Sequence, residues 1–338
     1  TTFKNGSSKV LAETLSPFLK ANGHNASVFY NVSALTRLFS AKETDTNPLI
    51  WLALKAKHFF TDRKLFKNLR DKEAIIVCDF IPYAFYKHSY NIARLKKKLP
   101  GKPVLFYAVQ YLENAPTLMK RLNDEGHASI DRYDWHLTVS DITEVRNIQR
   151  SPWSRIGLNL QSTGLKPVIK EKFLAVVDFK QPGYERYRQE QIEVLEELQV
   201  PYIALEKKYT LDEIREIYKL ASIYFIQSFE AYGMPIAENL ACGAFVFTAE
   251  NSWPMSWRLN EEVEIHGPGE LPECFVVYHD KDGLRKRIKD IREGYDPEKT
   301  PLWVFNEFVK NYPQYYYGDE EGLNQALKWI QDFLEKKN

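Results

Sequence analysis

The feature of the sequence that most constrains its fold is a repeated alternation of short apolar segments with longer amphipathic segments. Most of the short segments are apolar at consecutive positions, a pattern typical of strands whose two faces are both buried. Strands separated by helices form parallel sheets, because each helix carries the chain back across the sheet before the next strand begins. We therefore predict an α/β protein built on parallel sheets.

The first half of the chain follows this scheme after an incomplete start. Its predicted strands are residues 26–30, 74–80, 103–109 and 135–140, and its predicted helices are a segment ending before Gly23, 49–70 and 89–98. A Rossmann-like unit begins with a strand, but only the segment TTFKNGSS precedes the first helix. We therefore expect the chain to begin in the loop after a first strand that is missing or truncated.

The second half repeats the scheme. Its predicted strands are 172–179, 201–206, 222–228, 244–249 and 274–278, and its predicted helices are 184–198, 210–221, 235–242 and 320–337. Thr210 and Glu213 have the spacing of a capping box at the start of one helix. The turn-rich segment 149–167 marks the junction, and 338 residues suit two domains. We predict two Rossmann-like domains, 1–155 and 156–338, facing each other across a cleft, with a last helix that can cross back to the first domain.

The most informative stretch is the strand–turn–helix at residues 223–249. A strand ends near Gln227, and a short helix begins at Pro235, because proline is favoured in the first turn, where its missing N–H costs nothing. Gly243 suits the end of that helix. The start of the helix therefore presents backbone N–H groups and the positive end of a dipole at the carboxyl edge of a parallel sheet, which is a site for phosphate.

Two carboxylates, Glu230 and Glu238, flank these amides with seven residues between them. Carboxylates accept hydrogen bonds from neighbouring hydroxyls, whereas amides suit an anion. A nucleotide sugar offers hexose hydroxyls, a diphosphate and ribose hydroxyls in the same order. The alternative is an ordinary strand–turn–helix with two solvated glutamates.

The segment SFEAYGMPIAENLACGAFVFTA, with Glu230-x7-Glu238, resembles the Glu-x7-Glu signature of retaining glycosyltransferases of the GT-B fold, above all family 4. The similarity covers about residues 172–285 and only the architecture of the first half. It implies that Glu230 holds the donor hexose and Glu238 the ribose. The donor would also contact Gly233, Met234 and Pro235 at the start of the helix.

The resemblance has departures in the segment that should grip the diphosphate. The family usually supplies an Arg and a Lys after the first donor-domain strand, whereas this chain offers Lys180 and then Arg186 or Arg188. Lys180 is the first choice as a catalytic residue beside Glu230, and Arg186 is a further donor-binding candidate. Solvated surface residues are the alternative for both. The serine before Glu230 is also one residue closer than usual.

The first domain contributes weaker candidates. Gly6 and Ser7 resemble the loop whose amides approach the diphosphate, with a plain turn as the alternative. Gln110 stands where many family members carry a histidine near the reacting bond. Asp79 and His88 are the other acceptor-side or leaving-group candidates, although a purely structural role is the simpler interpretation of each.

The resemblance implies metal-independent transfer of a hexosyl group, with retention, from a nucleotide-diphosphate sugar to a hydroxyl acceptor, as in polysaccharide or glycolipid assembly. A UDP sugar is the preferred donor, a carbohydrate or lipid-linked sugar the acceptor, and no cofactor is needed. Alanine at Glu230 or Glu238 should abolish transfer and leave the fold intact. A sugar-nucleotide epimerase and a catalytically silent nucleotide-sugar-binding protein are the alternatives.

Charge is divided between the two halves. Residues 1–160 carry 24 Lys and Arg against 14 Asp and Glu, whereas 161–338 carry 22 against 31. The basic segments 55–72 and 94–102 could rest on an anionic membrane surface, or simply form a solvated outer face. No nucleic-acid-binding module accompanies the charge, so we expect no nucleic-acid partner.

Three features indicate the compartment. Cys78, Cys242 and Cys274 lie in or beside apolar runs without metal-site spacing, so we expect buried thiols in a reducing environment. The sequence has no secretory signal and no apolar run long enough to span a bilayer. We expect a cytoplasmic protein, or one held peripherally on the cytoplasmic membrane face.

Overall fold

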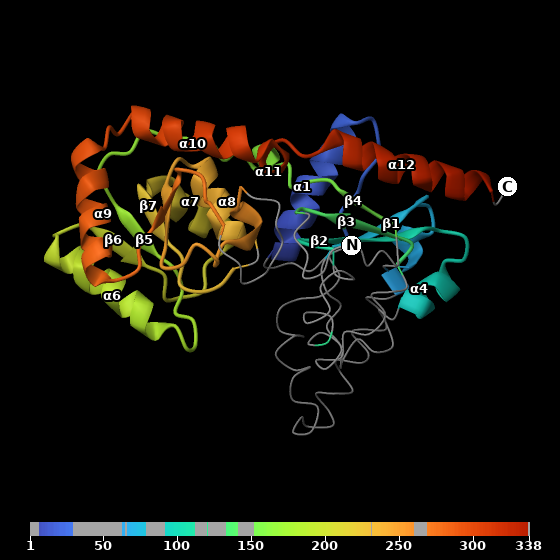
Figure 1. Ribbon diagram of the computed structural model, residues 1–338. Helices are drawn as coiled ribbons and strands as arrows, with labels where there is room; N and C mark the ends of the chain where they lie inside the picture. The colour runs from blue at the N-terminus through green and yellow to red at the C-terminus, as the bar shows by residue number, and fades with distance from the viewer. Residues whose placement is uncertain are drawn as a thin grey trace, which may run out of the picture. The chain divides into compact units, whose positions relative to one another are not determined.

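The structure, a computed structural model, describes residues 7–29, 63–64, 66–78, 92–111, 120, 133–140, 152–230, 232–259 and 269–336, without the side chains of Ser7 and 92–94. The chain divides into two compact units, one formed by Thr1–Leu158 with Asp319–Asn338 and the other by Asn159–Gly318 (Figure 1). Each unit contains a sheet of parallel strands with helices, so the predicted α/β class is confirmed, and the architecture is compatible with two Rossmann-like units.

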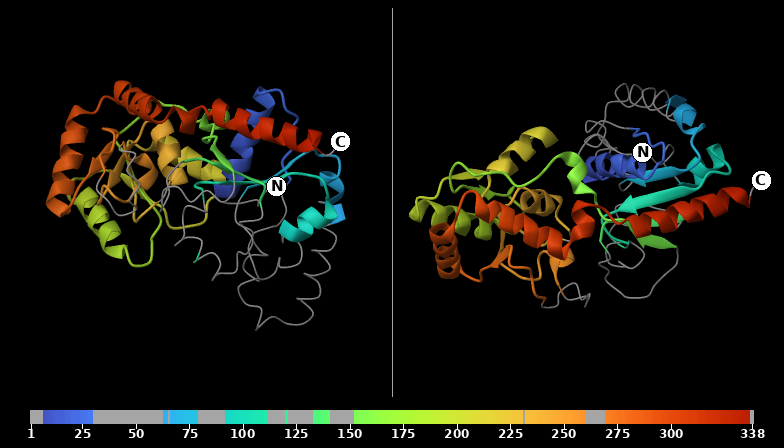
Figure 2. Two further views of the ribbon diagram at one scale, coloured as in Figure 1. Left: turned by 45° about the vertical axis from the view of Figure 1, so that its right-hand side comes forward. Right: turned by 90° about the horizontal axis from the view of Figure 1, so that it is seen from above.

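The first unit has a parallel sheet in the order β1-β2-β3-β4. Its strands are β1 (Ile75–Cys78), β2 (Val104–Ala108), β3 (Trp135–Thr138) and β4 (Trp153–Arg155). Its helices are α1 (Ser7–Ala21), α4 (Ile92–Lys98) and α12 (Glu320–Glu335). Helix α1 packs on β1 and β2, while α12 packs on β4 (Figure 2, α12 in red). The last helix of the chain therefore belongs to the first unit.

One prediction in this unit is wrong, and one strand was missed. Residues 26–29 of the predicted strand 26–30 form no strand, because no described strand pairs with them, although their exposure alternates. They line a pocket of about 360 Å³ together with residues of α1, β1 and α12. The predicted junction segment 149–167 does contain the boundary between the two units, at Leu158 and Asn159. The same segment also holds the missed strand β4, in which Trp153 stacks on Tyr111 and Ser154 accepts a hydrogen bond from the Trp135 indole. Of the predicted helix 49–70, only 63–64 and 66–70 are described, and all of these except residue 70 are helical.

Helix α12 approaches β4 so closely that one position must be glycine. A Cβ atom added at Gly322 would lie 1.6 Å from the carbonyl oxygen of Arg155. No rotamer change can relieve a contact between two backbone groups, so α12 would have to move. Asp319, which caps this helix by accepting from the Gly322 N–H at 3.1 Å, also pairs with Arg155 at 3.3 Å.

Replacing Gly322 with alanine is therefore expected to lower the free energy of unfolding by about 2–4 kcal/mol. The matched control is Gly294→Ala, at the end of another helix, where an added Cβ meets nothing within 4 Å. That change should be neutral or slightly stabilising, since alanine restricts the unfolded chain. Urea denaturation of both variants checks the prediction, and equal stabilities would contradict the close approach.

The second unit has a parallel sheet in the order β6-β5-β7-β8-β9. Its strands are β5 (Ala175–Val177), β6 (Tyr202–Ala204), β7 (Ile223–Phe225), β8 (Phe245–Thr248) and β9 (Phe275–Val277). The chain leaves β5 toward β6 on one side and returns to β7 on the other. The carboxyl ends of β5 and β7 therefore form the topological switch point at which open α/β sheets bind ligands.

The helices of this unit are α6 (Glu185–Glu197), α7 (Leu211–Leu220), α8 (Met234–Ala241), α9 (Lys281–Gly294), α10 (Lys299–Asn311) and α11 (Pro313–Tyr316), and its 3-10 turns are η3 (Leu160–Thr163) and η4 (Met255–Trp257). Helices α6, α7 and α8 begin and end within one residue of the predicted positions. The capping box of Thr210 and Glu213 is confirmed, as is the glycine at 243 after α8, with a φ of 82°. Helices α9 to α11 were not predicted. The three cysteines are buried and free, as expected.

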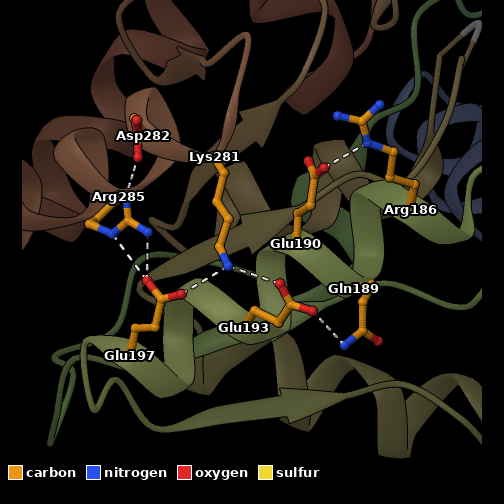
Figure 3. A network of polar contacts seen from close by, with 8 residues as sticks. All are labelled: Arg186, Gln189, Glu190, Glu193, Glu197, Lys281, Asp282 and Arg285. Carbon is orange, nitrogen blue, oxygen red and sulfur yellow. Dashed lines mark hydrogen bonds and ion pairs between the residues drawn. The ribbon is translucent and has the colours of Figure 1, made fainter.

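Two features hold the helices of the second unit in place. The buried Lys170 donates hydrogen bonds to the carbonyl oxygens of Lys219 at 2.7 Å and Cys242 at 2.8 Å, and so caps the ends of α7 and α8. On the surface, Lys281 of α9 lies between Glu193 and Glu197 of α6, at 2.9 and 2.8 Å (Figure 3). The first of these contacts fixes α8, whose amino end forms the candidate site.

Candidate functional site

The candidate site lies in the second unit, in the loops that follow β5 and β7. These strands are neighbours and pair in parallel with Val177 opposite Phe225. The Asp178 N–H continues the ladder by donating to the Phe225 carbonyl at 3.3 Å. The two loops therefore leave the same sheet edge side by side.

The loop after β7 is fixed by the segment that follows β8. The Glu230 N–H donates to the Trp253 carbonyl at 3.0 Å, and the Met255 N–H donates to the Glu230 carbonyl at 3.3 Å. The indole N–H of the fully buried Trp257 donates to the Tyr232 carbonyl at 2.5 Å. Three backbone groups of the loop, the N–H and carbonyl of Glu230 and the carbonyl of Tyr232, are thus held by the segment after β8. These bonds orient the Glu230 side chain without using its carboxylate.

Helix α8 begins at Met234, one residue before the predicted start, and Pro235 occupies its second position. Gly233 precedes it with a φ of 67°, a conformation that favours glycine. The N–H groups of Ile236 and Ala237 already donate to the Gly233 carbonyl, at 2.9 and 3.4 Å. The N–H groups of Gly233 and Met234 have no acceptor among the described residues. Of the amides at the start of α8, these two are therefore the candidates for binding an anion.

The Glu230 carboxylate is half-buried, and within the described part of the chain it has no hydrogen-bond or ion-pair partner. Burial, and secondarily the negative charge of Asp178, raise the pKa of Glu230 to about 7. A buried acid without a protein partner is unfavourable for folding. Such a group at a switch point is a candidate for ligand binding.

Asp178 is a site residue that the sequence analysis missed. It follows β5 directly, its side chain is buried, and its Oδ1 atom has no hydrogen-bond partner among the described residues. Burial raises the pKa of Asp178 to about 6, against the opposing effects of the Phe179 N–H, the Tyr224 hydroxyl and the Arg188 charge. The sequence contained one signal for this residue, because Asp178 stands near the carboxyl end of the predicted strand 172–179, where open α/β sheets bind ligands.

Glu238 is placed differently from Glu230. Its side chain is only 3% exposed, and Nε and Nη2 of Arg215, on α7, both lie 2.8 Å from its Oε1 atom. Burial raises the pKa of Glu238, and the Arg215 charge opposes that shift. The carboxylate expected to hold a ribose therefore already has a partner inside the unit.

The cationic candidates also separate in the structure. Lys180 is exposed two residues after Asp178 and has no partner among the residues described. Arg186 is 85% exposed and pairs with Glu190 at 2.6 Å on the surface of α6 (Figure 3). Arg188 is instead the arginine at the carboxyl ends of β5 and β6, because its guanidinium donates to the carbonyl oxygens of Asp178 at 3.1 Å and Leu205 at 3.4 Å.

The candidates of the first domain are only partly described. Gly6, Asp79 and His88 lie outside the described residues. Ser7 is the first residue of α1. Gln110 is buried just after β2, at the carboxyl edge of the first unit's sheet.

No protein-family model matches the chain, and no curated protein matches it in sequence. Among the described residues, no group of three or more His, Cys, Asp and Glu side chains could hold a metal ion. None of the described helices is both long enough and apolar enough to cross a membrane. The chemistry of the site must therefore be argued from its own geometry.

Proposed function

We propose that the chain is a retaining glycosyltransferase of the GT-B type, which transfers a hexosyl group from a nucleotide-diphosphate sugar, preferably a UDP sugar, to a hydroxyl acceptor. The observation that carries this proposal is that the half-buried Glu230 carboxylate and the nearby amides of Gly233 and Met234 all lack a hydrogen-bond partner among the described residues. The second unit would bind the donor, and the first would bind a carbohydrate or lipid-linked acceptor at the cytoplasmic membrane face.

Each group has a chemical task in this proposal. Glu230 accepts hydrogen bonds from hexose hydroxyls, and the amides with the positive end of α8 hold the diphosphate. As the sugar–phosphate bond breaks, negative charge grows on the departing diphosphate. Lys180 is exposed, has no partner among the residues that the structure describes, and is the cation best placed after β5 to stabilise that charge.

A catalytically silent nucleotide-sugar-binding protein is the second candidate, and two observations favour it. Asp178 places a carboxylate where the family usually has its diphosphate-binding arginine close by, and Arg186 pairs with Glu190 instead. Arg188 binds carbonyl oxygens of the sheet edge. With these residues so placed, the departing diphosphate would be stabilised less, while the amides at the start of α8 could still bind the diphosphate of an intact nucleotide sugar.

A panel of UDP, GDP and ADP hexoses tests the proposal. We expect calorimetry to show binding of one donor at micromolar to millimolar affinity, and that donor to release its nucleotide diphosphate when acceptor extracts are added. Binding without release in any extract would favour the silent protein. No binding of any member of the panel would overturn both candidates.

A further inference from the structure

The strongest unassigned feature of the molecule is the buried carboxylate of Asp178 beside the Glu230 loop. Asp178 is 8% exposed, and its Oδ1 atom has no hydrogen-bond partner within the described ranges of the chain. Adjacent strands deliver the two acids to the same switch point, because the Asp178 N–H extends the ladder between β5 and β7. Neither acid is paired with a cation through its carboxylate in the part of the chain that the structure describes.

We propose that Asp178 and Glu230 act as one acid pair that binds neighbouring hydroxyl groups of the ligand. This inference deepens the proposed function and rests on it for the identity of the ligand. The family resemblance does not supply it, because Asp178 matches no residue of the Glu-x7-Glu signature.

The surroundings of the pair retain one proton on it at neutral pH. Asp178 is faced by Arg188 from α6, by Tyr224 from β7 and by Tyr218 from α7, besides Glu230 itself. Burial raises the pKa of both tyrosines well above its ordinary value, and the Asp178 charge raises each further, so neither is an ionised group at neutral pH. Arg188 is the one cation in this set, and its Nε donates to the Asp178 carbonyl. Ionising both acids would therefore place two negative charges together in a poorly solvated site.

A singly protonated pair is well suited to a sugar. The protonated acid donates one hydrogen bond, and the remaining oxygens accept others, so the pair can match two hydroxyls that each donate and accept. Loss of the last proton would add negative charge near the diphosphate of the ligand. Affinity for a nucleotide sugar should therefore fall as the pH rises.

Titration of the unliganded protein tests the pair directly. Carbon-13 NMR of labelled glutamate carboxyls, with the Glu230 signal assigned from Glu230→Gln, gives the midpoint of Glu230 in the wild type and in Asp178→Asn. We expect the midpoint to fall by about one pH unit in Asp178→Asn, because the neighbouring charge is removed while the burial remains. Glu250→Gln, an exposed acid after β8, is the matched control and should leave the midpoint unchanged. An unchanged midpoint in Asp178→Asn overturns the pair.

Binding of UDP-glucose gives the second readout, because its diphosphate does not change charge between pH 6 and 8.5. We expect wild-type affinity to fall about tenfold over this range and that of Asp178→Asn to change by less than about threefold. Parallel pH dependence in the two proteins would overturn the inference. If UDP-glucose and the other donors fail to bind the wild type, the proposed function fails, and the NMR midpoint alone decides whether the acids are coupled.

Discussion

Replacing Arg215 with methionine is expected to lower the free energy of unfolding by about 3–5 kcal/mol at pH 8. The guanidinium lies 2.8 Å from a Glu238 carboxylate that is 3% exposed, so its removal leaves a buried negative charge unpaired. Burial alone would then raise the pKa of Glu238 further, and the acid would take up a proton more readily. The loss should therefore be smaller at pH 5 than at pH 8, as measured by urea denaturation at both values.

The matched control is Arg186→Met, which removes an ion pair of similar length from the surface of α6. Its side chain is 85% exposed, so the change should cost less than about 0.5 kcal/mol. The double variant Arg215→Met with Glu238→Gln should recover much of the loss, because no charge is left buried. If Arg215→Met lowered the free energy of unfolding no more than Arg186→Met does, the Arg215–Glu238 ion pair would not stabilise the fold. Glu238→Ala is likewise expected to destabilise the unit, because it would leave the largely buried Arg215 guanidinium without its carboxylate.

The α/β class was predictable because buried parallel strands have a local signature. Segments such as 222–228 and 244–249 are apolar at nearly every position and contain β7 and β8. The predictions that failed depend on distant partners. Residues 26–29 have a strand-like pattern without a partner among the described strands, whereas β4 was missed inside a turn-rich segment that was correctly predicted as the junction. Its position depends on partners distant in sequence, such as Tyr111, on which Trp153 stacks.

The candidate site was predictable only where it is continuous in sequence. The turn from Glu230 to Gly233 and the start of α8 follow from local spacing, and the structure forms both. Partners from other elements left no local signal. Nothing near Glu238 in the sequence indicates Arg215, which lies on α7, and the choice between Arg186 and Arg188 depends on which side of α6 faces the sheet. Sequence therefore located the loop but not the charges around it.

Replacing Glu230 is expected to separate stability from activity. Glu230→Gln should raise the free energy of unfolding by about 2 kcal/mol at pH 8, because the pKa of Glu230 is about 7 in the folded protein against 4.5 in the unfolded chain. The folded protein binds the proton more tightly, so the wild type loses stability as the pH rises from about 4.5 through about 7, and the variant escapes that loss. Denaturation at pH 5 and pH 8 should show the gain mainly at pH 8.

Glu230→Ala should reduce nucleotide release from the preferred donor by at least about 100-fold, because the group that holds the hexose is removed. Glu250→Ala, the exposed acid of a neighbouring loop, should change neither stability nor release. Full release by Glu230→Ala would remove the assignment of the motif, whereas a stability gain without any ligand effect would leave the acid unexplained. An acid that costs stability when ionised and that no described residue pairs with is best accounted for by a ligand, since function is the usual reason that such strain is retained.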